Sequence, residues 1–112
     1  MGRFISASTF TTEIVNVSTT PFTATSGRTY LVDTTSTAIT INIPSADTAN
    51  VGDRISIVDP TGNWRTNFCT VGVNTATTKI ANLNETLVLN IPNNAVDLLY
   101  TGSQYGWVLL NA

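Results

Sequence analysis

The segment GDRISIVDPTGNW, residues 52–64, contains residue types that could form a metal or phosphate site. Asp53 and Arg54 are neighbours, and Asp59 is followed by the turn residues Pro, Gly and Asn. Oxygen atoms of Asp53, Asp59 and Asn63 could bind a calcium ion if this turn folds back. The spacing of an EF-hand is missing, however, and Asp ordinarily accepts backbone hydrogen bonds in turns. We therefore interpret Asp59 as the cap of a turn and expect no bound metal.

Side chains that carry out catalysis are scarce in the rest of the chain. The 112 residues include no His, one Cys and seven acidic residues. Without His, neither a Ser-His-Asp nor a Cys-His arrangement is possible, and zinc lacks its usual ligands. A carboxylate pair for glycoside hydrolysis would have to come from acids that lie mostly at predicted strand ends and turns. Cys69 lies in an apolar run and is interpreted as a core residue. The sequence therefore predicts a protein that is not an enzyme and has no cofactor.

The composition also disfavours charged partners. Charged residues make up 11% of the chain, and the net charge is -2. The five cationic residues are scattered, so the sequence predicts binding neither to nucleic acid nor to an acidic membrane. Threonine, at about a fifth of the chain, gives a neutral, hydrogen-bonding surface with little long-range steering. Such a surface suits a protein that sits in an assembly.

Alternation of apolar and polar residues with a period of two is the main structural signal. It places Ile55 and Ile57 on one face of a strand, with Arg54 on the other. Turn residues separate such runs about every ten residues, which is typical of a β-sandwich or barrel. We predict an all-β, antiparallel β-sandwich, jelly-roll-like, with about eight strands. Further strands are predicted at Glu13–Val17, Arg28–Val32, 67–73 and 106–110, with inward residues Ile39, Ile41, Ile43, Leu87, Leu89, Ile91, Val96, Leu98 and Tyr100.

Two regions of the chain differ in how often turn residues occur. Residues 1–20 have few turn residues and are predicted to form an extended N-terminal arm and a first strand. Residues 21–112 are predicted to form the β-sandwich domain. Phe4, Ile5 and Phe10 are the apolar anchors of the arm, and we expect them to contact a neighbouring subunit.

Aromatic residues offer a second kind of site. Trp64 follows a turn and is expected to be partly exposed, and Tyr105 and Trp107 have the same parity on the predicted last strand. These rings could stack on a sugar, as aromatic residues do in carbohydrate-binding modules. A core or intersubunit cluster is the alternative that we favour. Adjacent strand residues point to opposite faces, so Arg54 is expected to serve a partner other than Asp53.

The run YLVDTTSTAITINIPSADTANVGDRISIVD, followed downstream by GWVLLN, resembles a β-module of tailed-bacteriophage virion proteins. In that module a Y-x-V-D-T strand precedes an alternating strand, a Gly-Asp pair opens the next strand, and a late tryptophan closes the sheet. The resemblance covers roughly residues 28–111. The matching positions are Tyr30, Val32, Asp33, Ile39, Ile41, Ile43, Pro44, Gly52, Asp53, Ile55, Ile57, Asp59 and Trp107.

The resemblance implies a structural virion protein. One copy of the module with an arm looks like a capsid decoration, or cement, protein, whereas tail fibres usually carry the module within a longer chain. It implies a homotrimer that binds the major capsid protein on the outer capsid surface, after synthesis in the host cytoplasm. The alternative is a tail-fibre or receptor-binding module that recognises a host glycan through Trp64. The expected interface residues are Phe4, Ile5, Phe10, Arg54 and Trp64.

Deletion of residues 1–12 tests the predicted role of the arm. The truncated protein is expected to lose binding to undecorated capsids, because its apolar anchors are gone, while its circular dichroism remains that of a folded β-domain. Co-sedimentation with capsids measures the binding. Undiminished binding of the folded, truncated protein would contradict the arm hypothesis.

Overall fold

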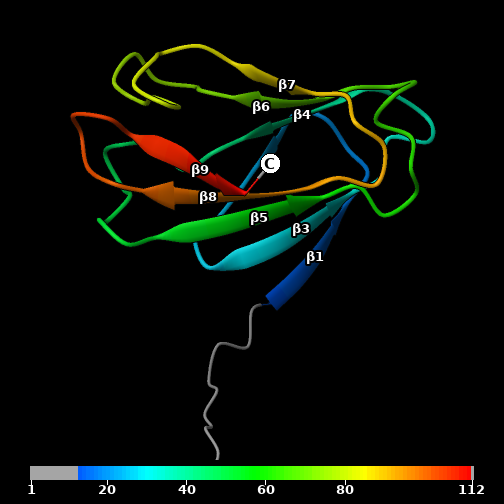
Figure 1. Cartoon of the computed structure of the whole chain (residues 1–112), viewed down its shortest axis with the longest axis horizontal. Coiled ribbons are helices and arrows are strands. Elements are labelled where there is room, and N and C mark those ends of the chain that lie inside the picture. Colours follow the sequence, from blue (N-terminus) through cyan, green and yellow to red (C-terminus); the bar gives the residue numbers. More distant parts are fainter. Residues whose placement is uncertain (1–12, 112) are drawn as a thin grey trace, which may run out of the picture.

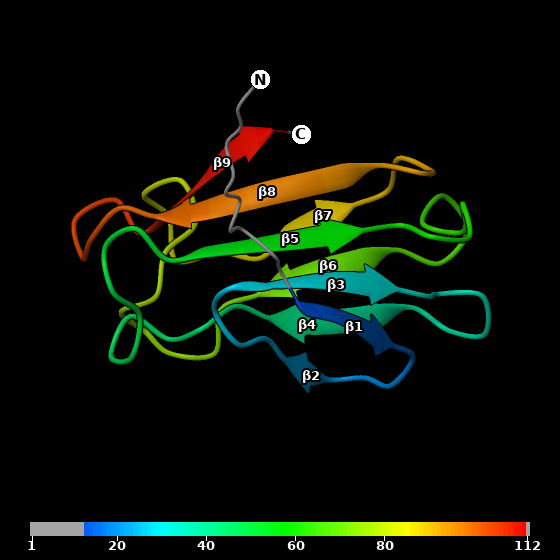
Figure 2. The same ribbon diagram turned by 90° about the horizontal axis from the view of Figure 1, so that it is seen from below.

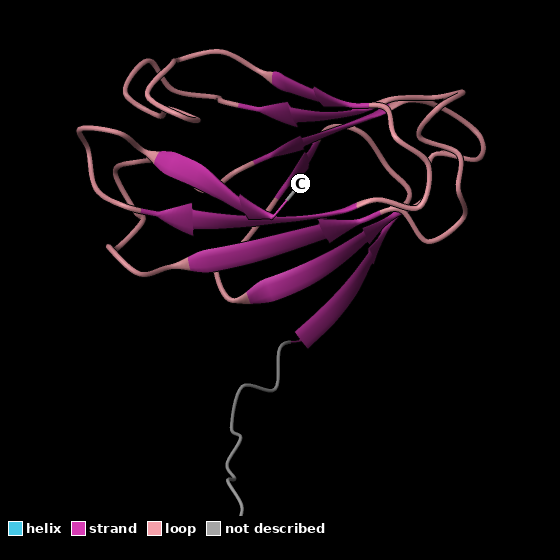
Figure 3. Ribbon diagram, in the orientation of Figure 1, coloured by secondary structure: helices cyan, strands magenta, loops and turns pink. Residues whose placement is uncertain are grey.

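The computed structural model describes residues 13–111, which form nine strands and no helix (Figures 1 and 3). None of the described segments is therefore a helix that could cross a membrane. The strands are β1 (Glu13–Val17), β2 (Phe22–Thr23), β3 (Arg28–Val32), β4 (Ile39–Asn42), β5 (Arg54–Val58), β6 (Cys69–Gly72), β7 (Leu87–Leu89), β8 (Ala95–Tyr100) and β9 (Trp107–Asn111).

The strands form two sheets that face each other across the core (Figures 1 and 2). The larger sheet has the order β1-β3-β5-β8-β9, and the smaller sheet has the order β2-β4-β6-β7. From β1 to β6 the chain enters the two sheets alternately. It then adds β7 to the smaller sheet and finishes with β8 and β9 in the larger one. The prediction of an all-β protein is confirmed.

The prediction of a wholly antiparallel, jelly-roll-like arrangement is wrong for the first six strands. β1 pairs with β3, β3 with β5, β2 with β4 and β4 with β6, and all four pairings are parallel. The reason is the winding of the chain. Each strand returns to its own sheet only after crossing the other one, so successive strands of one sheet run in the same direction. Only the pairings of β5 with β8, β6 with β7 and β8 with β9 are antiparallel.

Side chains from both sheets fill a common core. The alternation predicted for β5 is observed, with Ile55 and Ile57 buried and Arg54 exposed. Burial of one such aliphatic side chain stabilises the fold by roughly 1.5–3 kcal/mol. The largest fully buried side chains are Trp64, Trp107, Tyr30, Ile39, Ile41, Ile43, Ile55, Ile57, Leu98, Val17, Val32 and Val71.

Most of the predicted strands are observed, with one difference at the end of β7. The bounds of β1 and β3 agree with the prediction, and the inward residues of β8 are buried. Ile91, however, was predicted to point inward and is 59% exposed. β7 ends at Leu89, so Ile91 lies in the turn that leads to β8. Alternation could not reveal that the strand stops two residues earlier.

A tight turn at Ala81 and Asn82 packs against the start of β9. Both residues have positive φ, 51° and 70°, and Ile80 and Leu83 on either side form an antiparallel bridge. The Ala81 N–H donates to the Trp107 carbonyl (2.7 Å), and the Trp107 N–H donates to the Lys79 carbonyl (2.8 Å). This contact requires glycine at position 106, where φ is +75° and an added Cβ would lie 2.3 Å from the Lys79 carbonyl oxygen.

Substitution Gly106→Ala is therefore expected to reduce the free energy of unfolding by roughly 3 kcal/mol or more, because it adds a backbone clash to left-handed strain. Gly27→Ala is the matched control. Gly27 has a similar φ of +83° but open space around the added Cβ, so strain alone predicts a loss of about 1 kcal/mol. Urea unfolding measures both values. Equal losses for the two variants would contradict the close approach of residues 79 and 106.

Candidate functional site

The carboxylate of Asp59 accepts hydrogen bonds from five backbone N–H groups. Asp59 is only 3% exposed and lies directly after β5. Its Oδ1 accepts from the N–H groups of Thr61 (3.3 Å), Gly62 (2.9 Å) and Asn63 (3.3 Å). The interpretation of Asp59 as the cap of this turn is confirmed. A carboxylate surrounded in this way by backbone donors is a structural group, not one presented to a substrate.

The second oxygen of Asp59 joins two distant segments. Oδ2 accepts from the N–H of Trp64 (3.2 Å) and from the N–H of Asn93 (2.9 Å). The Asp59 N–H in turn donates to the Asn94 carbonyl (2.9 Å). Asp59 therefore fixes both the crossover from β5 to β6 and the turn before β8. The sequence indicated the local cap, but nothing in it indicated the contact with residues 93 and 94.

Trp64 is fully buried, so its expected partial exposure is wrong. Its exposed fraction is 0%, and its Nε1 donates to the Val32 carbonyl (3.1 Å). The bond from its N–H to Asp59 draws residue 64 inward, and the indole ring then fills the end of the core. Trp64 is thus unavailable both for stacking on a sugar and for direct contact with another subunit.

Asp53 lies at the other end of β5 from Asp59. Its Oδ2 accepts from the Asn50 N–H (2.9 Å) and closes the turn that leads into the strand. The three residues considered for calcium therefore do not converge, because a strand separates Asp53 from the pair Asp59 and Asn63. No group of three or more His, Cys, Asp or Glu side chains within residues 13–111 is placed to hold a metal ion.

A small polar network connects Asp33 with the Asp59 turn. Asp33 Oδ1 accepts from the hydroxyl and the N–H of Thr35, and Asn63 Nδ2 donates to the hydroxyl of Thr35 (2.9 Å). The hydrogen bond from the Thr35 hydroxyl is the main reason that the pKa of Asp33 lies below its ordinary value of 3.8. The ionised carboxylate therefore contributes stability above that pH, and the contribution is lost as the pH falls through the lower folded-state pKa.

Cys69 is buried, which confirms its interpretation as a core residue. Burial, and secondarily the charge of Asp59, raises the pKa of its thiol to about 12. The thiol is therefore protonated at neutral pH, and the nucleophilic thiolate is essentially unpopulated.

The remaining predicted aromatic residues are divided between the core and the surface. Trp107 is fully buried and packs against Tyr100 at a ring-centroid distance of 5.3 Å. Tyr105 is 51% exposed and lies in the β8–β9 turn, before the last strand begins. The expected common face for Tyr105 and Trp107 is therefore not observed, and no aromatic platform forms from these rings.

Of the expected interface residues, Arg54 lies on the outer face of the larger sheet and is exposed. Its cross-strand neighbour is Leu99, which is paired in turn with Val108. We define the outer face as the residues that alternate with the buried ones on these strands: Ile14, Asn16, Thr29, Leu31, Arg54, Ser56, Val58, Ala95, Asp97, Leu99, Val108 and Leu110. Phe4, Ile5 and Phe10 lie outside the described residues.

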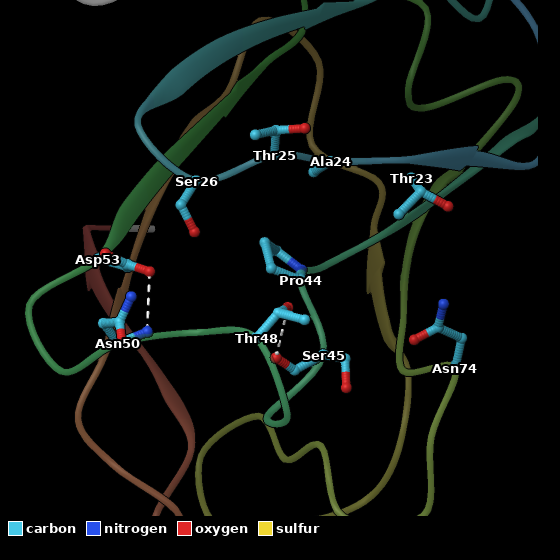
Figure 4. A pocket seen from close by; sticks show the side chains of 10 residues that line it. All are labelled: Thr23, Ala24, Thr25, Ser26, Pro44, Ser45, Thr48, Asn50, Asp53 and Asn74. Carbon is cyan, nitrogen blue, oxygen red and sulfur yellow. Dashed lines mark hydrogen bonds between the residues drawn. The ribbon is translucent and has the colours of Figure 1, made fainter.

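A recess lies where the loops after β2, β4 and β6 meet (Figure 4). Its volume is about 520 Å³. Ala24 and Pro44 contribute apolar surface, and both are buried. Its main polar lining residues are Thr23, Ser26, Thr48, Asn50, Asp53 and Asn74.

The recess has no signature in the sequence, because its residues come from separate loops. Asp53 was singled out for calcium, whereas the structure places it beside Ser and Asn side chains. Thr, Ser and Asn are also common throughout the chain, so no local pattern distinguishes those that line the recess. Comparison with known proteins adds no assignment, since neither a protein-family model nor a curated protein matches this sequence.

The substitution Asp59→Asn is expected to lower the free energy of unfolding by about 3 kcal/mol. It removes the charge, and its NH₂ group would face backbone donors that have no other acceptor. Asp47→Asn is the matched control, because Asp47 is exposed and its carboxylate accepts no hydrogen bond from a described residue. Urea unfolding measures both variants. A loss for Asp59→Asn no larger than that for Asp47→Asn would show that the buried carboxylate does not organise the two turns.

Proposed function

We propose that this chain is a non-catalytic virion protein that binds the outer surface of a phage capsid and stabilises contacts between capsid subunits. The observation that carries the proposal is the outer face of the larger sheet. It presents aliphatic side chains at an exposed surface, together with one cation, Arg54. The family resemblance adds the identity of the partner, the major capsid protein, and the homotrimeric state.

The outer face has the chemistry of a protein contact surface. Ile14 is 63% exposed and Leu110 is 46% exposed. Leu31, Val58 and Leu99 lie between them and are half-buried. Interfaces between proteins are enriched in arginine, and this face combines aliphatic residues with Arg54.

Ser56 and Asp97 provide the polar centre of the outer face. They are cross-strand partners on β5 and β8, and the Ser56 hydroxyl donates to Asp97 Oδ1 at 2.6 Å. This bond satisfies part of the hydrogen-bonding capacity of Asp97 within the sheet. Covering the face with another protein would therefore leave fewer polar groups without partners.

The structural roles of the reactive side chains support a function without catalysis. Asp59 is surrounded by backbone donors, and Cys69 is buried with a raised thiol pKa. A protein that only adds interface area stabilises a shell by mass action, because it binds the assembled state and not the dissociated subunits. The alternative function, recognition of a host glycan through Trp64, receives no support because the Trp64 ring is buried.

Lysine substitutions on the two sheets test the proposal. The double variant Ile14→Lys, Leu110→Lys is expected to weaken binding to undecorated capsids at least tenfold, because charge would be desolvated in an apolar contact. Co-sedimentation of the protein with capsids measures the affinity.

Val88→Lys is the matched control, since Val88 is 49% exposed on β7 and lies on the outward side of the smaller sheet. Arg54→Ala and Arg65→Ala form a second pair with the same change of charge, on and off the outer face. If the outer-face variants bind as well as their controls, this face is not the capsid contact.

A further inference from the structure

The recess between the loops is held in shape by bonds to the core. The Pro44 carbonyl accepts a hydrogen bond from Nε1 of the buried Trp107 (3.1 Å), which fixes the proline beneath the recess. The Ala24 N–H donates to the Asn42 carbonyl (2.8 Å), which fixes the other apolar segment. The base of the recess is therefore preformed, and a ligand would not have to order it on binding.

Polar groups lie at both ends of the recess. Asp53 and Asn50 lie at one end with Ser26 nearby, whereas Thr23 and Asn74 lie at the other (Figure 4). Asp53 Oδ2 is held by the Asn50 N–H, so Oδ1 is left to accept from a ligand. The side chains of Ser26, Thr23 and Asn74 form no hydrogen bond with other residues in the described part of the chain. These groups offer both donors and acceptors to a bound molecule.

The charges restrict the class of ligand. The lining contains one carboxylate and no Lys or Arg, which disfavours phosphate, sulfate and other anions. A metal ion would meet one carboxylate only, and calcium sites use six to eight oxygen ligands. A neutral molecule with several hydroxyl groups and an apolar C–H face matches both the polar ends and the apolar surface between them.

We propose that the recess binds a neutral saccharide. Its hydroxyl groups would donate to Asp53 Oδ1 and exchange hydrogen bonds with Ser26 and Asn74. The volume of about 520 Å³ is within the range of about 300–1,000 Å³ that is typical of small-molecule sites. This site goes beyond the proposed capsid role, and it shares no residue with the outer face.

Titration of the full-length, isotope-labelled protein followed by NMR tests the proposal. The probes are maltose, lactose and chitobiose, with sialyllactose and calcium chloride as charged comparisons. At least one neutral disaccharide is expected to shift the backbone amides of residues 23–26, 50–53 and 74, with a Kd of about 1 mM. Absence of such shifts at roughly ten times that concentration would overturn the proposal. So would larger shifts of these amides with sialyllactose or calcium.

Two variants and a matched control locate the site. Asp53→Asn retains an oxygen that can accept from the Asn50 N–H but removes the charge, and is expected to weaken binding roughly tenfold. Asn74→Ala is expected to weaken it about fivefold. Asn90→Ala is the control, because Asn90 is also an exposed loop asparagine following a strand of the smaller sheet. Equal effects of Asn74→Ala and Asn90→Ala would overturn the assignment to the recess. Capsid binding by all three variants is expected to remain that of the parent protein, so failure of this test and failure of the outer-face test are distinguishable.

Discussion

The buried carboxylate of Asp59 is the interaction on which the rest of the structure depends. A chain that crosses between two sheets must turn at their ends, where regular strand pairing no longer satisfies the backbone N–H groups. Buried N–H groups without partners destabilise a fold. One carboxylate answers this requirement for Thr61, Gly62, Asn63 and Trp64, and it also accepts from Asn93. The crossover after β5 and the turn before β8 are thereby joined in one region.

Two buried tryptophans extend this arrangement to the strands. Trp64, held by Asp59, donates from Nε1 to the carbonyl of Val32 at the end of β3. Trp107, at the start of β9, donates from Nε1 to the carbonyl of Pro44 just after β4. Each ring fills core volume and also satisfies a carbonyl where a strand ends. The second of these bonds holds Pro44 in place at the recess, so the same contact stabilises the core and shapes the recess.

The surfaces proposed to be functional are those that the core does not use. Several acidic residues stabilise the fold. The carboxylates of Asp33, Asp53 and Asp59 each accept a backbone hydrogen bond in a turn. The outward side of the smaller sheet is polar at Thr40 and Thr70. The outer face of the larger sheet is predominantly aliphatic around the polar pair of Ser56 and Asp97. This asymmetry is the physical basis for proposing that the larger sheet meets another protein.

Local features were predictable from the sequence, because alternation and turn chemistry act over a few residues. They correctly predicted the bounds of β1 and β3, the burial of Ile55 and Ile57, and the cap formed by Asp59. Alternation does not encode which strand pairs with which, however. Strands buried on one face read alike whether their neighbours are parallel or antiparallel, so the winding between sheets was not predicted.

The burial of Trp64 and the existence of the recess were likewise outside the reach of local patterns. Trp64 follows a turn, which suggests exposure, but its hydrogen bonds to Asp59 and Val32 bring the ring into the core. The recess is assembled from loops around residues 23–26, 44–53 and 74, whose separation along the chain conceals their proximity. The sequence by itself determined most of the strands, most of their inward residues and the cap formed by Asp59. Only the tertiary structure decided the pairing of the strands, the burial of the tryptophans and the grouping of the recess residues, because these depend on contacts between segments far apart in the chain.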